Sequence, residues 1–505
     1  MNPEQTTGRR DVRIAIMGAG PGGICMGIQL KKAGFENFVL LERADALGGT
    51  WRRNTYPGCS CDIPSLLYSF SFETKLDWSR PYGPQPEVLD YMEHCAKKYG
   101  ILPHTRLQTR VDSAAWEDDR ACWTLRLDSG ESLEADVLVS AIGMFNDLAE
   151  PQIKGLDTFE GKIIHSARWD WDHDLRGETV GVIGSAASAV QLVPEIVKET
   201  GPLYLFQRTA NWVMPKEDEP LTDEILQNLQ TNPEAATIMR DLIYKGVDEG
   251  MTFSDPVAVK EMEDAVLAAM EVIEDPEVRE NLKPQHPFGC KRPLLSNVYF
   301  EAFNRPNLEL VTEGIDHLTR NSIVTQDGKE HVVDTVVLAT GFETTHYLSA
   351  VDVRGRNGLH IEDAWSDGAH AYLGITTAGF PNLFMLYGPN TNNGSILEMI
   401  EAQVDYAVRK IQHLAEEDLG WVDVRPEPQE RWNEDVQEAI KGISAWQANC
   451  NGYYRSPSGR IVTQWPHSMS EFRERTSKPD ADNFESGPLP ESAAGKKRPG
   501  ILESI

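Results

Sequence analysis

Residues 11–23, DVRIAIMGAGPGG, carry the pattern that decides the fold. The apolar run at residues 12–17 predicts a buried strand, which leads into Gly18, Gly20 and Gly23 in the spacing G-x-G-x-x-G. These glycines permit a tight turn and a close approach of a pyrophosphate to the N-terminus of the next helix. A second apolar run, FVLLE, ends at Glu42, where an acid accepts hydrogen bonds from ribose hydroxyls. The segment predicts a Rossmann-like fold that binds a dinucleotide, and we refer to it as the FAD domain.

The same order of strand, turn and helix recurs at residues 179–197, TVGVIGSAASAVQLVPEIV. The turn reads Gly-x-Ala-x-x-Ala from Gly184, and Arg208 lies at the offset from Gly184 that separates Glu42 from Gly18. A cation there pairs with a 2′-phosphate, and Thr209 adds a hydroxyl, so the second motif predicts binding of NADPH rather than NADH. An unrelated surface arginine is the alternative. The cofactor residues expected in the turn itself are Gly184, Ser185 and Ser188.

The two motifs predict an α/β protein in which one dinucleotide-binding domain is inserted into another. ADVLVSAIG at residues 135–143 and VDTVVLATG at residues 333–341 share the positions of Asp, Ala and Gly. We expect the first to close the N-terminal half of the FAD domain and the second to return the chain to that domain. The expected parts are a flexible N-terminus (1–10), the FAD domain (11–149 and 331–477), the NADPH domain (150–330) with a helical insertion at about 217–285, and a flexible tail (478–505).

Composition narrows the possible partners. The 505 residues carry a formal net charge of -30, which argues against nucleic acids and anionic membrane surfaces as partners. No apolar run approaches the roughly 20 residues of a membrane span, and the N-terminus lacks the pattern of a signal peptide. Seven scattered cysteines indicate reduced thiols, as in a cytoplasm. Cys59 and Cys61 lack a second ligand pair, so no metal site is expected.

Two longer patterns identify a family. Between the dinucleotide motifs, Phe159, Gly161, His165, Trp169 and Asp170 form F-x-G-x-x-x-H-x-x-x-W-D. This pattern resembles the fingerprint of the type I Baeyer-Villiger monooxygenases, and residues 48–62, GGTWRRNTYPGCSCD, are similar to a second signature of that family. The resemblance extends over residues 12–465. It implies that the fingerprint is a hinge between the domains whose conformation follows NADP occupancy.

The resemblance also implies the chemistry. NADPH reduces FAD, O2 forms a flavin C4a-peroxide, and one oxygen atom is inserted next to a ketone carbonyl to give an ester or lactone. Arg292, in FGCKRP, is expected to supply a fixed positive charge, held by Asp62, while Lys291 joins Arg208 and Thr209 at the 2′-phosphate. Further cofactor contacts are expected from Trp51, Tyr68 and Val111.

Several alternatives stay open at this level. Asp62 could cap a helix ahead of IPSLLYSF, and His165 could be a hydrogen-bonded helix cap. The related flavin monooxygenases, which oxidise nitrogen and sulfur, have Tyr or Phe where this chain has Trp169 and Asp170. A non-enzymatic dinucleotide redox sensor is the third possibility. Neither the identity of the ketone nor the oligomeric state follows from the sequence.

Overall fold

The computed structural model describes residues 10–448, 450, 452–491 and 500–502. The flexible segments expected at residues 1–9, 492–499 and 503–505 lie outside this range. The larger half of the molecule contains one parallel sheet in the order β21-β7-β1-β2-β3. The buried residues of β1 and β2 are all apolar, as the sequence predicted for this motif. The strands are β1 (Ile14–Met17), β2 (Phe38–Leu41), β3 (Thr105–Arg106), β7 (Val137–Ser140) and β21 (Leu383–Met385).

Helices and a small sheet cover this parallel sheet. Helix α1 (Pro21–Lys32) follows β1, has Pro21 at its first turn, and packs against α11 (Ile396–Glu416). A second layer has the strand order β20-β4-β5-β6 and encloses its own core around Trp123. Its strands are β4 (Val111–Glu117), β5 (Cys122–Leu127), β6 (Ser132–Ala135) and β20 (Asp352–Arg354). Further helices of this half are α2 (Thr50–Arg53), α3 (Gln85–Lys98), α10 (Ile361–Ala364), α12 (Pro426–Lys441) and α13 (Ser444–Gln447).

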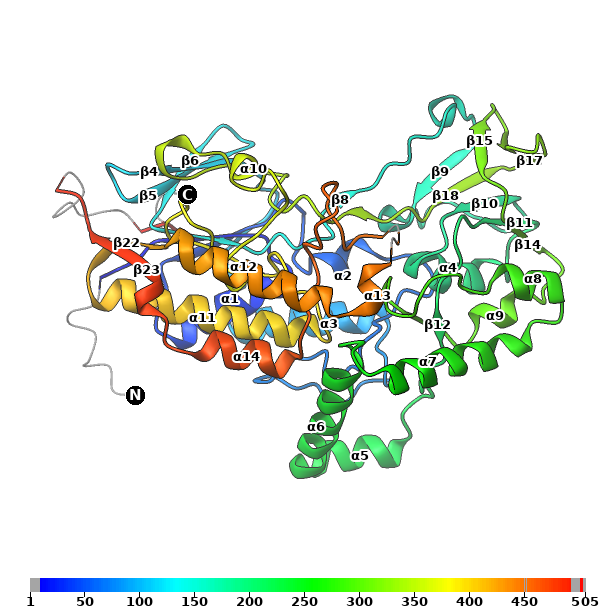
Figure 1. The fold of residues 1–505 in the computed structure, drawn as a ribbon, viewed down its shortest axis with the longest axis horizontal. Coiled ribbons are helices and arrows are strands. Elements are labelled where there is room, and N and C mark those ends of the chain that lie inside the picture. Colours follow the sequence, from blue (N-terminus) through cyan, green and yellow to red (C-terminus); the bar gives the residue numbers. More distant parts are fainter. Residues whose placement is uncertain (1–9, 449, 451, 492–499, 503–505) are drawn as a thin grey trace.

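The other half contains a second parallel sheet, in the order β14-β11-β10-β18-β9, which lies on the right in Figure 1. Helix α4 (Ala187–Ile196) follows β10, as the second motif predicted. The strands are β9 (Lys162–His165), β10 (Val180–Ile183), β11 (Leu203–Phe206), β14 (Leu308–Val311) and β18 (Thr335–Leu338). Shorter elements beside it are β12 (Val213–Met214), β13 (Leu294–Leu295), α9 (Tyr299–Ala302), β15 (Ile315–Leu318), β16 (Ser322–Thr325) and β17 (Glu330–Val332).

The position of β18 corrects the expected domain boundary at residue 330. Thr335 to Leu338 pair in parallel with β10 and with β9, so this repeated segment closes the second domain and does not return the chain to the first. The return comes at β19 (Phe342–Glu343), which pairs antiparallel with β8 (Asp147–Leu148) of the outgoing connection. The two connections between the domains therefore lie side by side.

A helical insertion leaves the second domain where the sequence predicted it. It consists of α5 (Asp223–Thr231), α6 (Pro233–Gly250), α7 (Pro256–Ala269) and α8 (Pro276–Asn281), and α5 and α6 project downward in Figure 1. Each of these helices begins with a side-chain cap that accepts a hydrogen bond from a backbone N–H of the first turn. The capping residues are Thr222, Asn232, Asp255 and Asp275.

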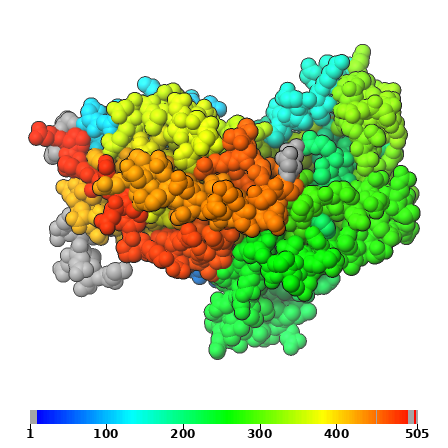
Figure 2. Space-filling model, viewed as in Figure 1, coloured from blue at the N-terminus to red at the C-terminus, as the bar shows by residue number. Residues whose placement is uncertain are grey.

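The insertion also contacts the first domain. Asp248 of α6 accepts hydrogen bonds from the backbone nitrogens of Met469 (2.6 Å) and Ser470 (3.2 Å) at the start of α14 (Met469–Ser477). The Arg240 guanidinium of α6 pairs with the buried carboxylate of Glu398 on α11. Figure 2 shows these helices meeting at the surface.

Two expectations for the chain ends are corrected. Residues 484–488, placed in the flexible tail, form β23 (Phe484–Pro488), which pairs antiparallel with β22 (Leu419–Val424). Arg10, placed in the flexible N-terminus, donates its backbone N–H to the Ala415 carbonyl at 3.1 Å. Both segments form backbone hydrogen bonds with residues distant in sequence, which local sequence patterns do not predict. Within the described part of the chain, no helix has the length and apolar character needed to cross a membrane.

Candidate functional site

The first dinucleotide turn has the geometry that its glycines predicted. Gly18 has φ +102°, and a Cβ on it would lie 2.6 Å from the Ala141 carbonyl oxygen. A Cβ on Gly23 would lie 2.0 Å from the Gly18 oxygen, so no side chain fits there. Both oxygens of Glu42 accept backbone hydrogen bonds at 2.8 Å, from Ala19 within the turn and from Ala44. The turn, the helix N-terminus and the acid thus adjoin, which fits a dinucleotide.

Gly20 belongs to this turn, and Val111 lies near it. A Cβ on Gly20 would be 3.4 Å from the Cα of Gly49, so the second signature packs closely onto the turn. Val111 is buried at the start of β4, and Thr109, two residues earlier, donates its N–H to the Glu42 carbonyl at 2.8 Å. Val111 is therefore close to the expected ribose site, although its contact with a cofactor stays a prediction.

The second turn repeats the geometry of the first. Gly184 has φ +112°, and a Cβ on it would lie 2.4 Å from the Ala339 oxygen. The hydroxyl of Ser185 donates to the Thr209 carbonyl at 3.1 Å, which joins the turn to the segment after β11. Ser188 is half-buried in the first turn of α4. The structure therefore brings together the residues that the sequence predicted for this site.

Cations gather at the end of β11. Arg208 is exposed, and burial together with the positive charge of Arg208 lowers the pKa of Lys291. Burial and the charge of Lys291 in turn lower the pKa of His286 to about 4. Burial and repulsion by Arg208 both disfavour the positive charge on Lys291. A bound phosphate would offset both effects. The residues present thus fit the 2′-phosphate of NADPH.

Arg292 and Asp62 meet at the junction of the two domains. The Arg292 Nε donates to Asp62 Oδ2 at 2.8 Å across 230 residues of sequence, and the two side chains are 21% and 38% exposed. Burial opposes the charge on Arg292, but Asp62 and then Tyr453 outweigh it, so the pKa of Arg292 is raised well above its usual value. Residues 62–69, all described, form turns rather than a helix, so the alternative that Asp62 is a helix cap is wrong.

Aromatic residues surround this ion pair. The indole N–H of Trp51 donates to the Tyr68 hydroxyl at 3.0 Å, and the two rings meet edge to face. Tyr387, Tyr453 and Tyr454 also interact electrostatically with Arg292. These three tyrosines were not predicted from the sequence. The available signal was their position in two loops rich in Gly, Asn and Pro, LYGPNTNNG for Tyr387 and NGYYRSPSGR for Tyr453 and Tyr454, because loops often carry binding residues.

Phe159 and Gly161 lie just before the edge strand β9, His165 ends it, and Trp169 and Asp170 follow it. A Cβ on Gly161 would lie 2.2 Å from the Asp334 oxygen, so this position requires glycine. The half-buried ring of Trp169 packs against the main core, and Lys162 pairs with Asp170 at 2.5 Å. Phe159 is buried in a separate core beneath the second sheet.

His165 has the capping geometry that was left open. Its Nδ1 accepts a hydrogen bond from the Ala167 backbone N–H at 3.1 Å, and its Nε2 lies 3.4 Å from the Thr340 hydroxyl. Burial and then the charge of Arg168 lower its pKa, so the ring is neutral near pH 7. A groove of about 960 Å³ runs past it, lined also by Arg168 and Asp170.

The second signature contacts the second domain through α4. The Tyr56 hydroxyl donates to the Gln191 side chain at 2.8 Å, and Gln191 donates to the Ser60 carbonyl at 3.0 Å. A Cβ on Gly58 would lie 2.5 Å from the Gln191 carbonyl oxygen. The loop before Asp62 is thus held against the helix that follows the second dinucleotide turn.

One pair of cysteines departs from expectation. Cys290, which precedes Lys291 and Arg292, forms a disulfide with Cys450, with the two Cα atoms 6.2 Å apart. The prediction of seven reduced thiols is therefore wrong for these two, because a contact across 160 residues leaves no local pattern. The other five cysteines are free and buried.

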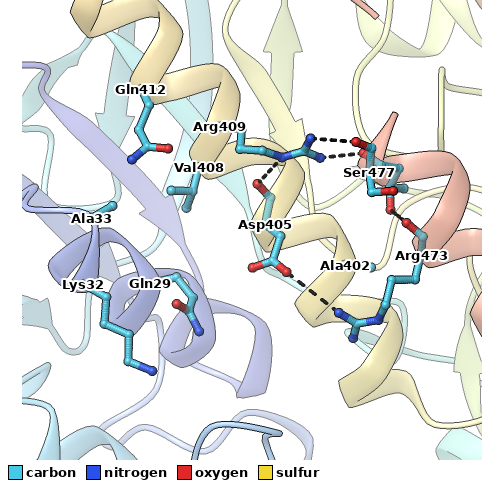
Figure 3. Close-up of a pocket in the computed structure, with 11 residues that line it drawn as sticks. Gln29, Lys32, Ala33, Ala402, Asp405, Val408, Arg409, Gln412, Arg473 and Ser477 are labelled. Carbon is cyan, nitrogen blue, oxygen red and sulfur yellow. Dashed lines mark hydrogen bonds and ion pairs between the residues drawn. The ribbon is translucent and has the colours of Figure 1, made fainter. Parts of the chain in front are cut away.

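A second cavity lies away from these residues. It occupies about 530 Å³ between α1, α11 and α14, where Arg473 pairs with Asp405 at 3.9 Å and Lys32 lines the wall formed by α1 (Figure 3). None of the predicted site residues lines it. We therefore place the candidate site at the domain junction.

Comparisons with known proteins agree with this geometry. Residues 15–268 match the family model described as pyridine nucleotide-disulphide oxidoreductase. A Baeyer-Villiger monooxygenase from Streptomyces coelicolor is 38% identical over 94% of this chain and 92% of its own length. A phenazine N-monooxygenase from Lysobacter antibioticus is 32% identical over 84% of this chain and 86% of its own length.

Solved structures match over the same extent. Cyclohexanone monooxygenase from Rhodococcus sp. Phi1, bound to NADP+, has a TM-score of 0.86 and 30% sequence identity, and the match covers 94% of this chain and 99% of that one. Further matching structures hold FAD and NADP together.

Proposed function

The chain belongs to the Baeyer-Villiger monooxygenase family, and we propose that it inserts one oxygen atom from O2 next to a ketone carbonyl, giving an ester or lactone. It is an NADPH-dependent flavin monooxygenase with FAD and NADPH as cofactors. The non-enzymatic redox sensor is therefore set aside. The observation that carries the proposal is the ion pair of Arg292 and Asp62, placed where the two dinucleotide domains meet.

FAD, when bound and reduced by NADPH, supplies the activation of O2. The protein has to stabilise negative charge that develops on oxygen during the transfer, and a fixed guanidinium does this without accepting or releasing a proton. Arg292 keeps its charge because its pKa is raised, chiefly by Asp62 against the cost of burial. The hydrogen bond from its Nε to Asp62 fixes its orientation, and we expect its other guanidinium nitrogens to face the substrate.

The surrounding residues exclude water and position the cofactors. The Tyr387 hydroxyl donates to the Asn392 side chain at 2.8 Å, which fixes the ring of this tyrosine. Lys291 and Arg208 hold the 2′-phosphate of NADPH, which orients the nicotinamide. The charges on Arg292 and Lys291, adjacent in sequence, thus serve two different ligands.

A second candidate activity is oxygenation of nitrogen or sulfur, because one relative is named a phenazine N-monooxygenase. The two activities are distinguished by the products formed from a panel of substrates when the enzyme is supplied with FAD, NADPH and 18O2. The panel contains cyclic and linear ketones, a thioether and an aromatic nitrogen heterocycle. We expect an ester or lactone with one 18O atom, identified by mass spectrometry. Conversion of only the thioether or the heterocycle would reject the ketone assignment.

A further inference from the structure

The disulfide between Cys290 and Cys450 joins the two halves of the active site. Cys290 is buried and lies two residues before Arg292, in the segment between α8 and β13. Cys450 is half-buried and lies three residues before Tyr453 in the segment after α13. The disulfide therefore connects the segment that carries Lys291 and Arg292 to the segment that carries Tyr453 and Tyr454.

Noncovalent contacts align the same two segments. The indole N–H of Trp446, a buried residue of α13, donates to the Gly289 carbonyl at 3.0 Å. A Cβ on Gly452 would lie 3.6 Å from the Lys291 side chain, and within the second segment the Arg455 guanidinium donates to the Trp446 carbonyl. The Trp446 and Gly452 contacts join the two segments in addition to the disulfide, so we expect them to keep the two cysteines close after reduction.

The remaining five thiols are poor competitors for an oxidant. All are buried, and burial raises the pKa of Cys59 and Cys95 to about 12 and that of Cys122 to about 11. Burial also raises the pKa of Cys25 and Cys61. Because the thiolate is the reactive form, we expect these five thiols to react slowly with an oxidant.

We propose that Cys290 and Cys450 are a redox modification site, oxidised by hydrogen peroxide and reduced by a dithiol, whose oxidised form clamps the tyrosine segment onto Lys291 and Arg292. The thiolate of Cys450, the more exposed of the two, attacks peroxide and becomes a sulfenic acid as the O–O bond breaks and hydroxide leaves. Cys290 then displaces the second hydroxide to form the S–S bond. Two thiols and one peroxide thus yield one disulfide and two waters.

The chemistry of the thiols can be tested apart from turnover. Protein prepared without reductant is denatured, alkylated with N-ethylmaleimide and weighed by mass spectrometry. We expect five adducts, one for each free cysteine, and seven after dithiothreitol treatment. Peroxide should return the reduced protein to five. Seven adducts before reduction, unchanged by peroxide, would overturn the proposal.

The clamp is tested with trypsin and with NADP+ alone. Reduction should speed native cleavage after Arg455, which the Trp446 contact then holds less firmly, and should raise the Kd for NADP+ at least about threefold. Cys450→Ser should behave like reduced protein whether or not dithiol or peroxide is present. Cys122→Ser, at a buried free cysteine in β5, is the matched control and should keep the response of the wild type.

Equal cleavage and equal NADP+ affinity in the two redox forms would show that the disulfide has no clamping role and reject the proposal. The link to oxygenation rests on the proposed function, since the clamped tyrosines face Arg292. If no ketone is converted, thiol counts, cleavage and NADP+ binding still decide the redox site. The two failures are therefore distinguishable.

Discussion

The residue on which the proposed chemistry depends most directly is Arg292. Arg292→Ala removes the fixed charge while leaving the dinucleotide turns intact, so we expect kcat for ketone conversion to fall by at least about a hundredfold. FAD should remain bound, and the flavin should still bleach when NADPH is added without O2. Stopped-flow absorbance and product analysis measure the two steps separately.

Arg292→Lys is the companion variant. It keeps a positive charge but loses the planar group that Asp62 orients through Nε, so we expect severe impairment as well. Ketone conversion by Arg292→Ala at close to the wild-type rate would refute the mechanism.

Arg208 decides the choice of reductant. Loss of one charge-assisted contact in Arg208→Ala should cost about 1.5–3 kcal/mol of NADPH binding, which is roughly a ten- to hundredfold rise in its KM. The KM for NADH should change little because NADH lacks the 2′-phosphate. Arg176→Ala, at an exposed arginine paired with Asp174 in the same domain, is the control. Equal effects on both cofactors would remove Arg208 from the phosphate site.

His286 predicts a pH dependence of stability. Its pKa is lowered to about 4 by burial and by Lys291, below the usual 6.5, so the folded protein binds fewer protons than the unfolded chain in this range. The stabilisation of the folded state by this neutral ring is fully present above pH 6.5, and the free energy of unfolding falls as the pH decreases toward 4. His286→Gln should flatten the fall in unfolding free energy over that interval in urea titrations. His346→Gln, at an exposed histidine, should leave the slope unchanged.

Among the elements, strand β9 and the residues on either side of it carry the fingerprint. Trp169→Ala removes a ring that packs on the main core between Arg168 and Asp170, two residues that line the groove at His165. We therefore expect FAD to stay bound while more of the NADPH consumed produces hydrogen peroxide. The ratio of product to NADPH consumed measures this coupling. Trp171→Ala, at the neighbouring ring that is 64% exposed, should have a smaller effect. An unchanged ratio in Trp169→Ala would rule out the hinge role.

Elements were predictable where their determinants are local. An apolar run, a glycine turn and a charged residue at the next strand end lie within about 30 residues, so both dinucleotide units could be recognised from the amino-acid sequence alone. The boundary at residue 330 could not. Strands β7 and β18 share one local pattern, and only their pairing partners, β1 and β10, show which sheet each completes.

The candidate site was predictable to the same degree. Motif residues such as Arg292 and Asp62 were identified through resemblance, and the structure brings them to 2.8 Å. Tyr387 and Tyr453 lie about 100 and about 160 residues beyond Arg292, and Cys450 lies 160 residues beyond Cys290 of the FGCKRP motif. Such approaches depend on tertiary packing.

For the whole molecule, the helical insertion connects the NADPH domain to helix α14 of the FAD domain. Asp248 accepts the first two backbone N–H groups of α14, beside the N-cap Ser468, and Met469 packs against Gly394 and Ser395 in the loop before α11. Asp248→Ala should lower the unfolding free energy by about 1 kcal/mol, as loss of a helix cap does, and should also increase uncoupled NADPH oxidation.

Asp255→Ala is the matched control for that variant, because Asp255 caps α7 within the insertion itself. Thermal unfolding should show similar losses in both variants, whereas the coupling defect should appear only in Asp248→Ala. A coupling defect of equal size in both would mean that the contact between insertion and FAD domain has no role in turnover.

The paired connections β8 and β19 restrict how the two domains can move. The two crossings are joined to each other by backbone pairing and by the Thr340 hydroxyl, which donates to the Ala149 carbonyl at 2.7 Å. They therefore form one double-stranded connection rather than two independent linkers. Because a double strand resists torsion more than a single chain does, we expect any change in the angle between the domains to be a tilt rather than a rotation about the connection.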